Sequence, residues 1–197
     1  MNDPVSKIDP SGKATTLVTF YSDLGIVKLG NHSGIHLSNT SEGPAIYDPG
    51  GGYTAKDEYG GPAGGSGDLF TGRAAELDPY IKSGTSVGNY VRLTTINTSQ
   101  SEEDSLLKSM DEAGGRSGGL CAVACASILG ELPALKKVAS GMLPDSVADS
   151  VAKSPRVVSD VMVRPDGSRY TIPRPKPPTA PRIPPCLKSL PGKIVCK

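Results

Sequence analysis

Alternating apolar and polar residues, many of them β-branched, recur along this chain and predict β-strands. The last two such segments are joined by Pro165-Asp166-Gly167, a sequence typical of a hairpin turn. The segments predicted as strands are 14–29 (one or two strands), 32–37, 45–47, 87–96, 157–163 and 168–172.

Other segments carry helical signals. Ser99 and Glu102 have the spacing of a capping box, and the helix that they open is expected to run to about Ala113, where two glycines follow. A second helix is predicted from Cys121 to Leu129, and its small residues favour close packing against a sheet. The remaining predicted helices are a short one at 68–82 and two between 134 and 153.

Glycine and proline shape the rest of the chain. The 197 residues include 24 Gly, 18 Pro and no Trp, a mixture that indicates many loops and a modest core. Residues 50–68 are glycine-dense and predict a long loop, whereas residues 173–185 are proline-rich and predict an extended arm. We therefore expect a linker at 1–13, one domain at 14–172 and a Pro-rich C-terminal tail at 173–197.

The charge pattern narrows the classes of function. The net charge is +1, and the lysines and arginines are scattered without accompanying aromatic residues, so nucleic-acid binding is not expected. No apolar run reaches the roughly 20 residues of a membrane-spanning helix, and the first residues lack the basic and apolar regions of a secretory signal. We expect the protein either to stay in the cytoplasm or to be exported by a route that uses no such signal.

Four cysteines occur as two pairs, Cys121 with Cys125 and Cys186 with Cys196. Four are too few for a disulfide scaffold at this length. Neither pair has the Cys-x-x-Cys spacing common in zinc sites, so a four-cysteine zinc site is a minor alternative, and we expect neither a metal nor a cofactor. Cys186 and Cys196 are equally compatible with a disulfide and with free thiols.

Cys121 is the candidate nucleophile. It follows Gly118 and Gly119 at the predicted start of a helix, where the positive end of the helix dipole lowers the pKa of a thiol and favours the reactive thiolate. Cys125 lies one turn further along the same face and leaves the choice of nucleophile open, although its distance from the helix start favours an inert thiol. The structural alternative is that both cysteines are small core residues.

His32 and His36 are the only histidines, so the choice of a base for such a thiol is narrow. Four residues apart on a strand, they point to the same face, and His32 is expected at the edge of its strand, after Gly30-Asn31. Asp48 is the candidate for the group that orients the imidazole, because it ends the next strand and a hairpin brings it near His32. The alternatives are a structural histidine and an aspartate that only caps its Asp-Pro-Gly turn.

The first residues resemble the end of the core region of Rhs/YD-repeat proteins, which often reads N-x-P-x-x-x-x-D-P-x-G. In that family the chain beyond this point is a variable C-terminal toxin. A dedicated apparatus, such as type VI secretion, delivers the toxin into a target cell, and a cognate immunity protein neutralises it. The resemblance therefore implies a toxin that needs no signal peptide. The matching residues are Asn2, Pro4, Asp9, Pro10 and Gly12.

The order His, strand, acid, long insert and helix-start Cys resembles the circularly permuted papain-like fold of the NlpC/P60-related and lecithin:retinol acyltransferase-like cysteine enzymes. The resemblance implies an α+β fold with an antiparallel sheet packed against helices, in which Cys121 attacks, His32 is the base and Asp48 orients it. One departure is Leu120, where the family often has Asn before the Cys. The matching residues are His32, Gly34, Ile35 and Leu37 (H-x-G/A-I-x-L), Tyr47, Asp48, Pro49 and Gly51 (Y-D-P-x-G), and Cys121, Ala122 and Leu129.

Together the two resemblances imply an antibacterial effector of interbacterial competition that hydrolyses or transfers acyl groups of amides or esters. Peptidoglycan peptides, phospholipids and protein side-chain amides all fit as substrates. Two alternatives stay open: an Rhs toxin of another class, namely a nuclease or an ADP-ribosyltransferase, and a non-catalytic interaction module in which Cys121 is a core residue.

Overall fold

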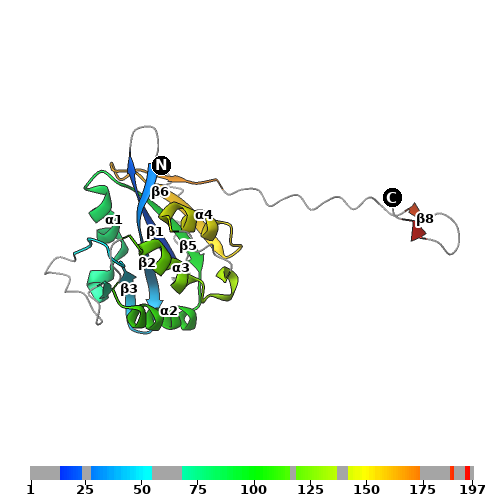
Figure 1. Ribbon diagram of the computed structural model, residues 1–197, viewed down its shortest axis with the longest axis horizontal. Helices are drawn as coiled ribbons and strands as arrows, with labels where there is room; N and C mark the ends of the chain where they lie inside the picture. Colours follow the sequence, from blue (N-terminus) through cyan, green and yellow to red (C-terminus); the bar gives the residue numbers. More distant parts are fainter. Residues whose placement is uncertain are drawn as a thin grey trace, which may run out of the picture.

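The computed structural model describes residues 14–23, 28–54, 68–115, 119–136, 142–173, 187–188 and 194–195. The described residues between 14 and 173 form a mixed α+β fold around a seven-stranded antiparallel sheet with the strand order β4-β3-β2-β1-β5-β6-β7 (Figure 1). The strands are β1 (Ala14–Asp23), β2 (Lys28–Thr40), β3 (Gly43–Tyr47), β4 (Leu69–Thr71), β5 (Tyr90–Asn97), β6 (Val157–Val163) and β7 (Arg169–Thr171). The helices are α1 (Leu77–Thr85), α2 (Gln100–Ala113), α3 (Cys121–Leu129) and α4 (Pro144–Ala152), with the 3-10 helices η2 (Gly72–Ala75) and η3 (Pro133–Leu135).

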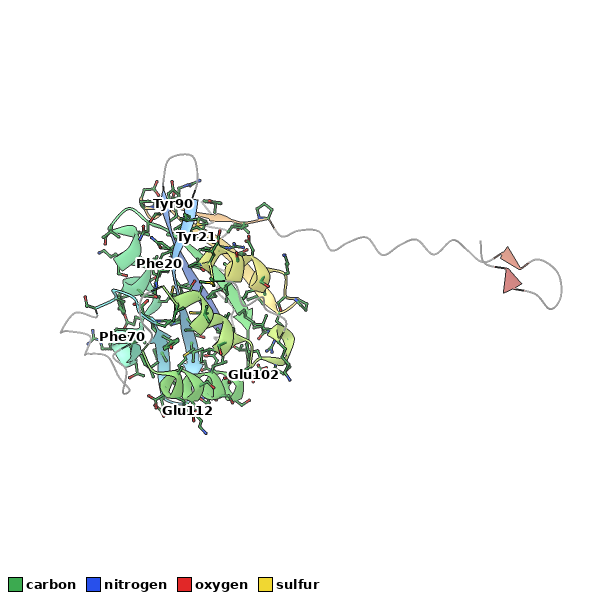
Figure 2. The ribbon with its side chains drawn as sticks, in the orientation of Figure 1. Phe20, Tyr21, Phe70, Tyr90, Glu102 and Glu112 are labelled. Atoms are coloured by element: carbon green, nitrogen blue, oxygen red, sulfur yellow. The ribbon has the colours of Figure 1, made fainter. Side chains whose placement is uncertain are left out.

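Two apolar cores lie on the two faces of the sheet. Successive side chains of a strand point to opposite faces, so the neighbours Leu17 and Val18 of β1 belong to different cores. The first core packs the sheet against α2, α3 and α4, and the second packs it against η2 and α1. Phe20 and Phe70, both labelled in Figure 2, belong to the second core. The site described below lies where β2 meets helices from both layers.

Helix α3 is buried almost all around. It begins at Cys121 and ends at Leu129, as predicted, and alanines and cysteines make up most of its length. Because small side chains let a helix approach closely, α3 packs directly on β2, in agreement with the expectation from its composition.

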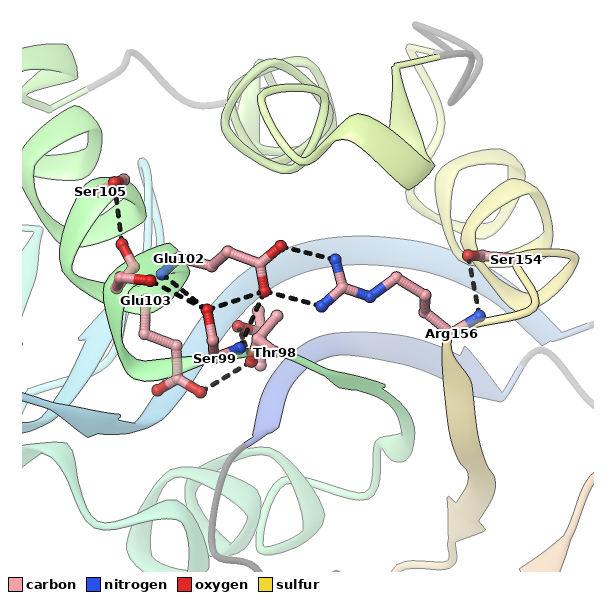
Figure 3. A network of polar contacts seen from close by, with 9 residues as sticks. Thr98, Ser99, Glu102, Glu103, Ser105, Ser154 and Arg156 are labelled. Carbon is pink, nitrogen blue, oxygen red and sulfur yellow. Dashed lines mark hydrogen bonds and ion pairs between the residues drawn. The ribbon is translucent and has the colours of Figure 1, made fainter.

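A polar network fixes the N-terminus of α2 (Figure 3). The predicted capping box is confirmed: the Ser99 side chain accepts the N–H of Glu102, and the Glu102 side chain accepts the N–H of Ser99. Glu102 also accepts two hydrogen bonds of 2.7 Å from the guanidinium of Arg156. The next carboxylate, Glu103, is fully buried and accepts the Thr98 hydroxyl and a backbone N–H of β2. These bonds tie α2 to β2, to the end of β5 and to the segment before β6.

Strand β2 extends beyond its partner β3. The register pairs Ile35 with Tyr47, the last residue of β3. Residues 28–34 pair with β1 on one side, but no described strand lies on their other side. Backbone groups on such an edge need other partners, and α3 and α4 approach β2 there. Gly30 is so close to the backbone of Asp145 that a Cβ at this position would collide with it.

The segment 68–82, predicted as one short helix, instead forms β4, η2 and most of α1. Leu69, Phe70 and Thr71 pair with β3, and their apolar and β-branched side chains suit a strand. Gly72 has a φ of 61°, a conformation that interrupts a continuous helix. The single-helix prediction is therefore wrong for the first half of the segment.

Three further boundaries differ from the predictions. Strand β2 is longer than 32–37, so His32 lies inside the strand and not at its end. Strand β5 starts at Tyr90, because residues 86–88 form a turn in which Gly88 has a φ of 87°. Of the two short helices predicted between 134 and 153, one is α4 and the other is the single 3-10 turn η3. The predicted hairpin of β6 and β7 is confirmed.

The predicted linker and most of the predicted tail lie outside the described residues. This applies to residues 1–13, to residues 174–185 of the proline-rich arm, to Cys186 and Cys196, and to residues 55–67 of the glycine-dense loop. Within the tail, β8 (Leu187–Lys188) and β9 (Ile194–Val195) pair antiparallel and were not among the predicted elements. None of the helices in the described ranges is both long and apolar enough to cross a membrane.

His36 is expected to make the stability of the fold sensitive to acid. Its side chain is buried, with one hydrogen bond to the Ala75 carbonyl of η2 and no partner for Nδ1 among the described residues. Burial lowers the pKa of His36 from 6.5 to about 4, so the unfolded chain binds the proton more readily than the folded chain. We expect this side chain alone to reduce the free energy of unfolding by roughly 3 kcal/mol between pH 6.5 and pH 4.

Urea denaturation at a series of pH values measures this effect in the wild type and in His36→Gln, whose amide can still donate to Ala75. Carboxylates titrate in both proteins, so the difference between the two curves isolates His36. The glutamine variant should lose less stability than the wild type as the pH falls. If the free energy of unfolding fell equally with pH in the two proteins, the result would contradict a neutral, buried His36.

Candidate active site

His32 and Asp48 contact each other beside the open part of β2. The Nε2 atom of His32 lies 2.6 Å from Oδ1 of Asp48. Asp48 directly follows β3, and the antiparallel pairing of β2 with β3 returns it alongside β2, so the structure brings these two predicted site residues together. Because Asp48 occupies Nε2, Nδ1 is the ring nitrogen that is left to face a thiol.

The Asp48 carboxylate is 2% exposed and accepts three hydrogen bonds. Besides His32, the Tyr80 hydroxyl on α1 donates to Oδ1, and the backbone N–H of Tyr53 donates to Oδ2 at 3.1 Å. Burial on its own raises the pKa of Asp48, but these three donors outweigh it and hold the pKa below its ordinary value. Asp48 is therefore ionised at neutral pH and can stabilise a protonated imidazole.

Two glycines shape the turn that follows Asp48. Gly50 has a φ of 64°, which the turn after Asp48 requires, and the N–H of Gly51 bonds back to the Asp48 carbonyl at 3.0 Å. A Cβ on Gly51 would collide with the Asp48 carboxylate. The hydroxyl of Tyr47, which precedes this turn, donates to the Gly114 carbonyl at 2.8 Å. The Y-D-P-x-G segment thus folds back over its own aspartate.

Cys121 is the first residue of α3 and reaches His32 across the open edge of β2. Its sulfur is hydrogen-bonded to His32 and accepts the backbone N–H groups of Ser33 and Ala122. Burial on its own raises the pKa of Cys121, but His32 and these N–H groups lower it below the ordinary value of a thiol. Cys121 is 4% exposed and the His32 side chain 19%, so a small part of the pair meets solvent.

The imidazole of His32 has the opposite shift. Burial on its own lowers the pKa of His32, but the hydrogen bonds and charges of Asp48 and Cys121 outweigh it and raise the pKa to about 9. The lowered pKa of the thiol and the raised pKa of the imidazole both favour the thiolate–imidazolium form of the pair. This ion pair is the activated form of a cysteine nucleophile.

Cys125, one helical turn after Cys121, has different surroundings. It is fully buried, and its thiol donates to the Ser33 carbonyl at 3.5 Å. Burial and the nearby Cys121 raise the pKa of Cys125 well above its ordinary value, so it stays protonated. Of the two cysteines that the sequence left as candidates, Cys121 is the one that the structure brings to His32.

His36 does not share this site. It lies on the same strand as His32, but its hydrogen bond goes to Ala75 of η2, in the second core. Sequence patterns also missed Tyr80 and Tyr53, because nothing in their spacing distinguishes them from the other tyrosines of the chain. The one general rule that points to such residues is that a buried aspartate needs several hydrogen-bond donors.

The chemical groups of the site are one thiol, one imidazole and one carboxylate, a set suited to acyl transfer through a thioester. Across the described ranges, no group of three or more His, Cys, Asp or Glu side chains is placed to hold a metal ion. No family model matches this sequence, and no curated protein and no solved structure matches it either, so its chemistry is inferred from its own residues.

Proposed function

We propose that this protein is a cysteine hydrolase or acyltransferase that acts on an amide or ester bond. The contacts that join Cys121, His32 and Asp48 support this proposal most directly, because they combine a nucleophile, a base and an acceptor that orients the base. If Cys121 were only a structural core residue, its contact with a histidine that a buried carboxylate holds in place would have no explanation.

In the first half-reaction, the thiolate of Cys121 attacks the substrate carbonyl carbon and forms a C–S bond. The backbone N–H of Cys121, at the start of α3, is a donor for the negative charge that develops on the carbonyl oxygen. The imidazolium of His32 then gives its Nδ1 proton to the leaving amine or alcohol as the C–N or C–O bond breaks. The products of this step are a thioester and a neutral imidazole.

In the second half-reaction, neutral His32 takes a proton from water or from another acceptor, which attacks the thioester carbonyl. The C–S bond breaks, and the thiolate and imidazolium are regenerated. Asp48 stays bonded to Nε2–H throughout, so the ring keeps one tautomer and one orientation.

We further propose that the domain is a permuted papain-like toxin of the Rhs type, delivered into a target cell and neutralised by a cognate immunity protein. The order of the parts along the chain supports the papain-like assignment: a histidine on an inner antiparallel strand, an aspartate after the next strand, and a cysteine at a later helix start. The Rhs type and its delivery rest on the resemblance of the first residues to the end of an Rhs core. Peptidoglycan peptides, lipids and protein side-chain amides are the substrate classes that this chemistry serves.

Bacterial growth tests this function with two matched variants. Cys121→Ser and Cys125→Ser make the same change one helical turn apart. We expect that expression of the wild type and of Cys125→Ser inhibits growth, and that Cys121→Ser is harmless, because a hydroxyl beside His32 is a far weaker nucleophile than a thiolate. Each protein is directed to the cytoplasm and to the periplasm, and the compartment in which growth stops separates cytoplasmic substrates from the cell wall.

Equal toxicity of Cys121→Ser and the wild type, at equal levels of folded protein, would refute the cysteine-enzyme proposal. That result would favour a toxin of another class, a nuclease or an ADP-ribosyltransferase. Loss of toxicity in both serine variants alike would point to damage to α3 and not to the loss of a nucleophile.

A further inference from the structure

Tyr80 is held in the interior by contacts that fix its ring and its hydroxyl. It lies on α1 and is 1% exposed. Its ring packs edge-on against Phe20 and Tyr53, with ring centroids 5.2 and 4.9 Å apart. Its hydroxyl donates to Oδ1 of Asp48, the same oxygen that His32 contacts.

Gly34 on β2 provides the space for this hydroxyl. A Cβ at Gly34 would overlap the Tyr80 hydroxyl and approach the Tyr47 carbonyl to 2.9 Å. Gly34 lies two residues after His32 on the same strand face, so a side chain there would push Tyr80 away from the Asp48 carboxylate. The glycine of the H-x-G/A-I-x-L segment thus has a physical role that involves Tyr80.

We propose that Tyr80 is a positioning residue of the cysteine site, acting through Asp48. His32 and the Tyr53 N–H hold the orientation of the carboxylate, and the Tyr80 hydroxyl shares Oδ1 with His32, so Tyr80 sets how strongly the carboxylate binds Nε2 of His32. This inference rests on the proposed function, because positioning His32 has a purpose only if His32 serves Cys121.

The shared oxygen gives Tyr80 a second effect, on the charge of His32. Two donors at Oδ1 divide the negative charge of one carboxylate, so the Tyr80 hydroxyl weakens the hold of Asp48 on a protonated imidazole. In the described structure, Asp48 and Cys121 are the titratable groups in contact with His32, and Tyr80 and Cys125 lie behind them. The apolar ring of Phe20, on β1, also packs on His32, with the two ring centroids 5.7 Å apart. Removal of the hydroxyl therefore favours the imidazolium.

Nuclear magnetic resonance of the histidine rings tests this effect, because the chain has two histidines and His36 is an internal reference. Tyr80→Phe keeps the ring and removes the hydroxyl. We expect it to raise the pKa of His32 by about one unit and to leave that of His36 unchanged. Tyr21→Phe is the matched control, since Tyr21 is also buried but its hydroxyl bonds to Arg92, and this variant should not move His32.

A double variant tests whether Tyr80 acts through Asp48. In an Asp48→Ala background, Tyr80→Phe should cause no further change in the titration of His32. A His32 titration that Tyr80→Phe leaves unmoved or shifts downward would overturn the inference. A shift of the same size with and without Asp48 would overturn it as well.

Alkylation of Cys121 by iodoacetamide at pH 6 separates this inference from the proposed function. A wild-type Cys121 that reacts at pH 6 no faster than an ordinary thiol would refute the cysteine-enzyme proposal, whatever Tyr80 does. Fast alkylation that depends on His32, together with an unmoved His32 titration in Tyr80→Phe, would refute the role of Tyr80 alone. Thermal unfolding of each variant shows that the compared proteins are folded.

Discussion

Replacement of Asp48 by alanine is expected to slow the alkylation of Cys121 by iodoacetamide at pH 7 about 100-fold. In the wild type, Asp48 helps to hold the pKa of His32 at about 9, and the imidazolium lowers the pKa of Cys121 and so favours its thiolate. Without Asp48, burial lowers the pKa of His32, so the imidazolium is lost as the pH rises through this lower value. A thiol at the ordinary value of 9.0 is only about 1% ionised at pH 7, which sets the expected factor.

Two controls accompany this measurement. Asp78→Ala removes an exposed carboxylate from α1, the helix that carries Tyr80, and should leave the alkylation rate at its wild-type value. Raising the pH above 9 should restore much of the rate in Asp48→Ala, because the Cys121 thiol then ionises without help from His32. An unchanged rate at pH 7 in Asp48→Ala would show that the ion pair forms without Asp48 and would contradict its role.

The largest loss of stability is expected from Asp160→Ala, about 3–5 kcal/mol in the free energy of unfolding. Asp160 on β6 accepts two hydrogen bonds, of 2.9 and 2.8 Å, from the guanidinium of Arg92 on β5, and a third from Thr94. Both side chains of the ion pair are buried, at 8% and 3% exposure. The alanine variant leaves the Arg92 charge in the interior with one remaining carboxylate partner, Asp149 of α4. Urea denaturation measures the loss.

Asp149→Ala is the matched control for this prediction. It removes the other carboxylate of Arg92, but the Asp149 side chain is 66% exposed, so the expected cost is below about 1 kcal/mol. The double variant Arg92→Met/Asp160→Leu should recover much of the stability lost in Asp160→Ala, because no charge is then left buried. Equal costs for Asp149→Ala and Asp160→Ala would show that burial does not govern this ion pair.

Local signals predicted the elements whose boundaries depend on nearby residues. The capping box at Ser99 and Glu102 and the run of small residues from Cys121 to Leu129 fix α2 and α3 through contacts within a few residues. The approach of Asp48 to His32 follows from a hairpin, in which a strand and its neighbour return along one another. These features required no knowledge of the rest of the fold.

Long-range packing explains what the sequence could not predict. Strand β4 exists because Leu69 and Phe70 add to the edge of β3, and their local pattern is equally compatible with a helix. Tyr80 reaches Asp48 because α1 packs on the second core, a contact between segments 32 residues apart in the chain. The open edge of β2 depends on where β3 stops, which no spacing in β2 reveals.

The two sulfur contacts of Ser33 hold the proposed nucleophile and the proposed base at a fixed spacing. Ser33 follows His32 in the chain, its N–H donates to Cys121, and its carbonyl accepts from Cys125. One residue, adjacent to the proposed base, therefore contacts both cysteines of the helix that carries the proposed nucleophile. It follows that these contacts, and not the length of the loops between Asp48 and Cys121, set the register of the proposed nucleophile with the proposed base.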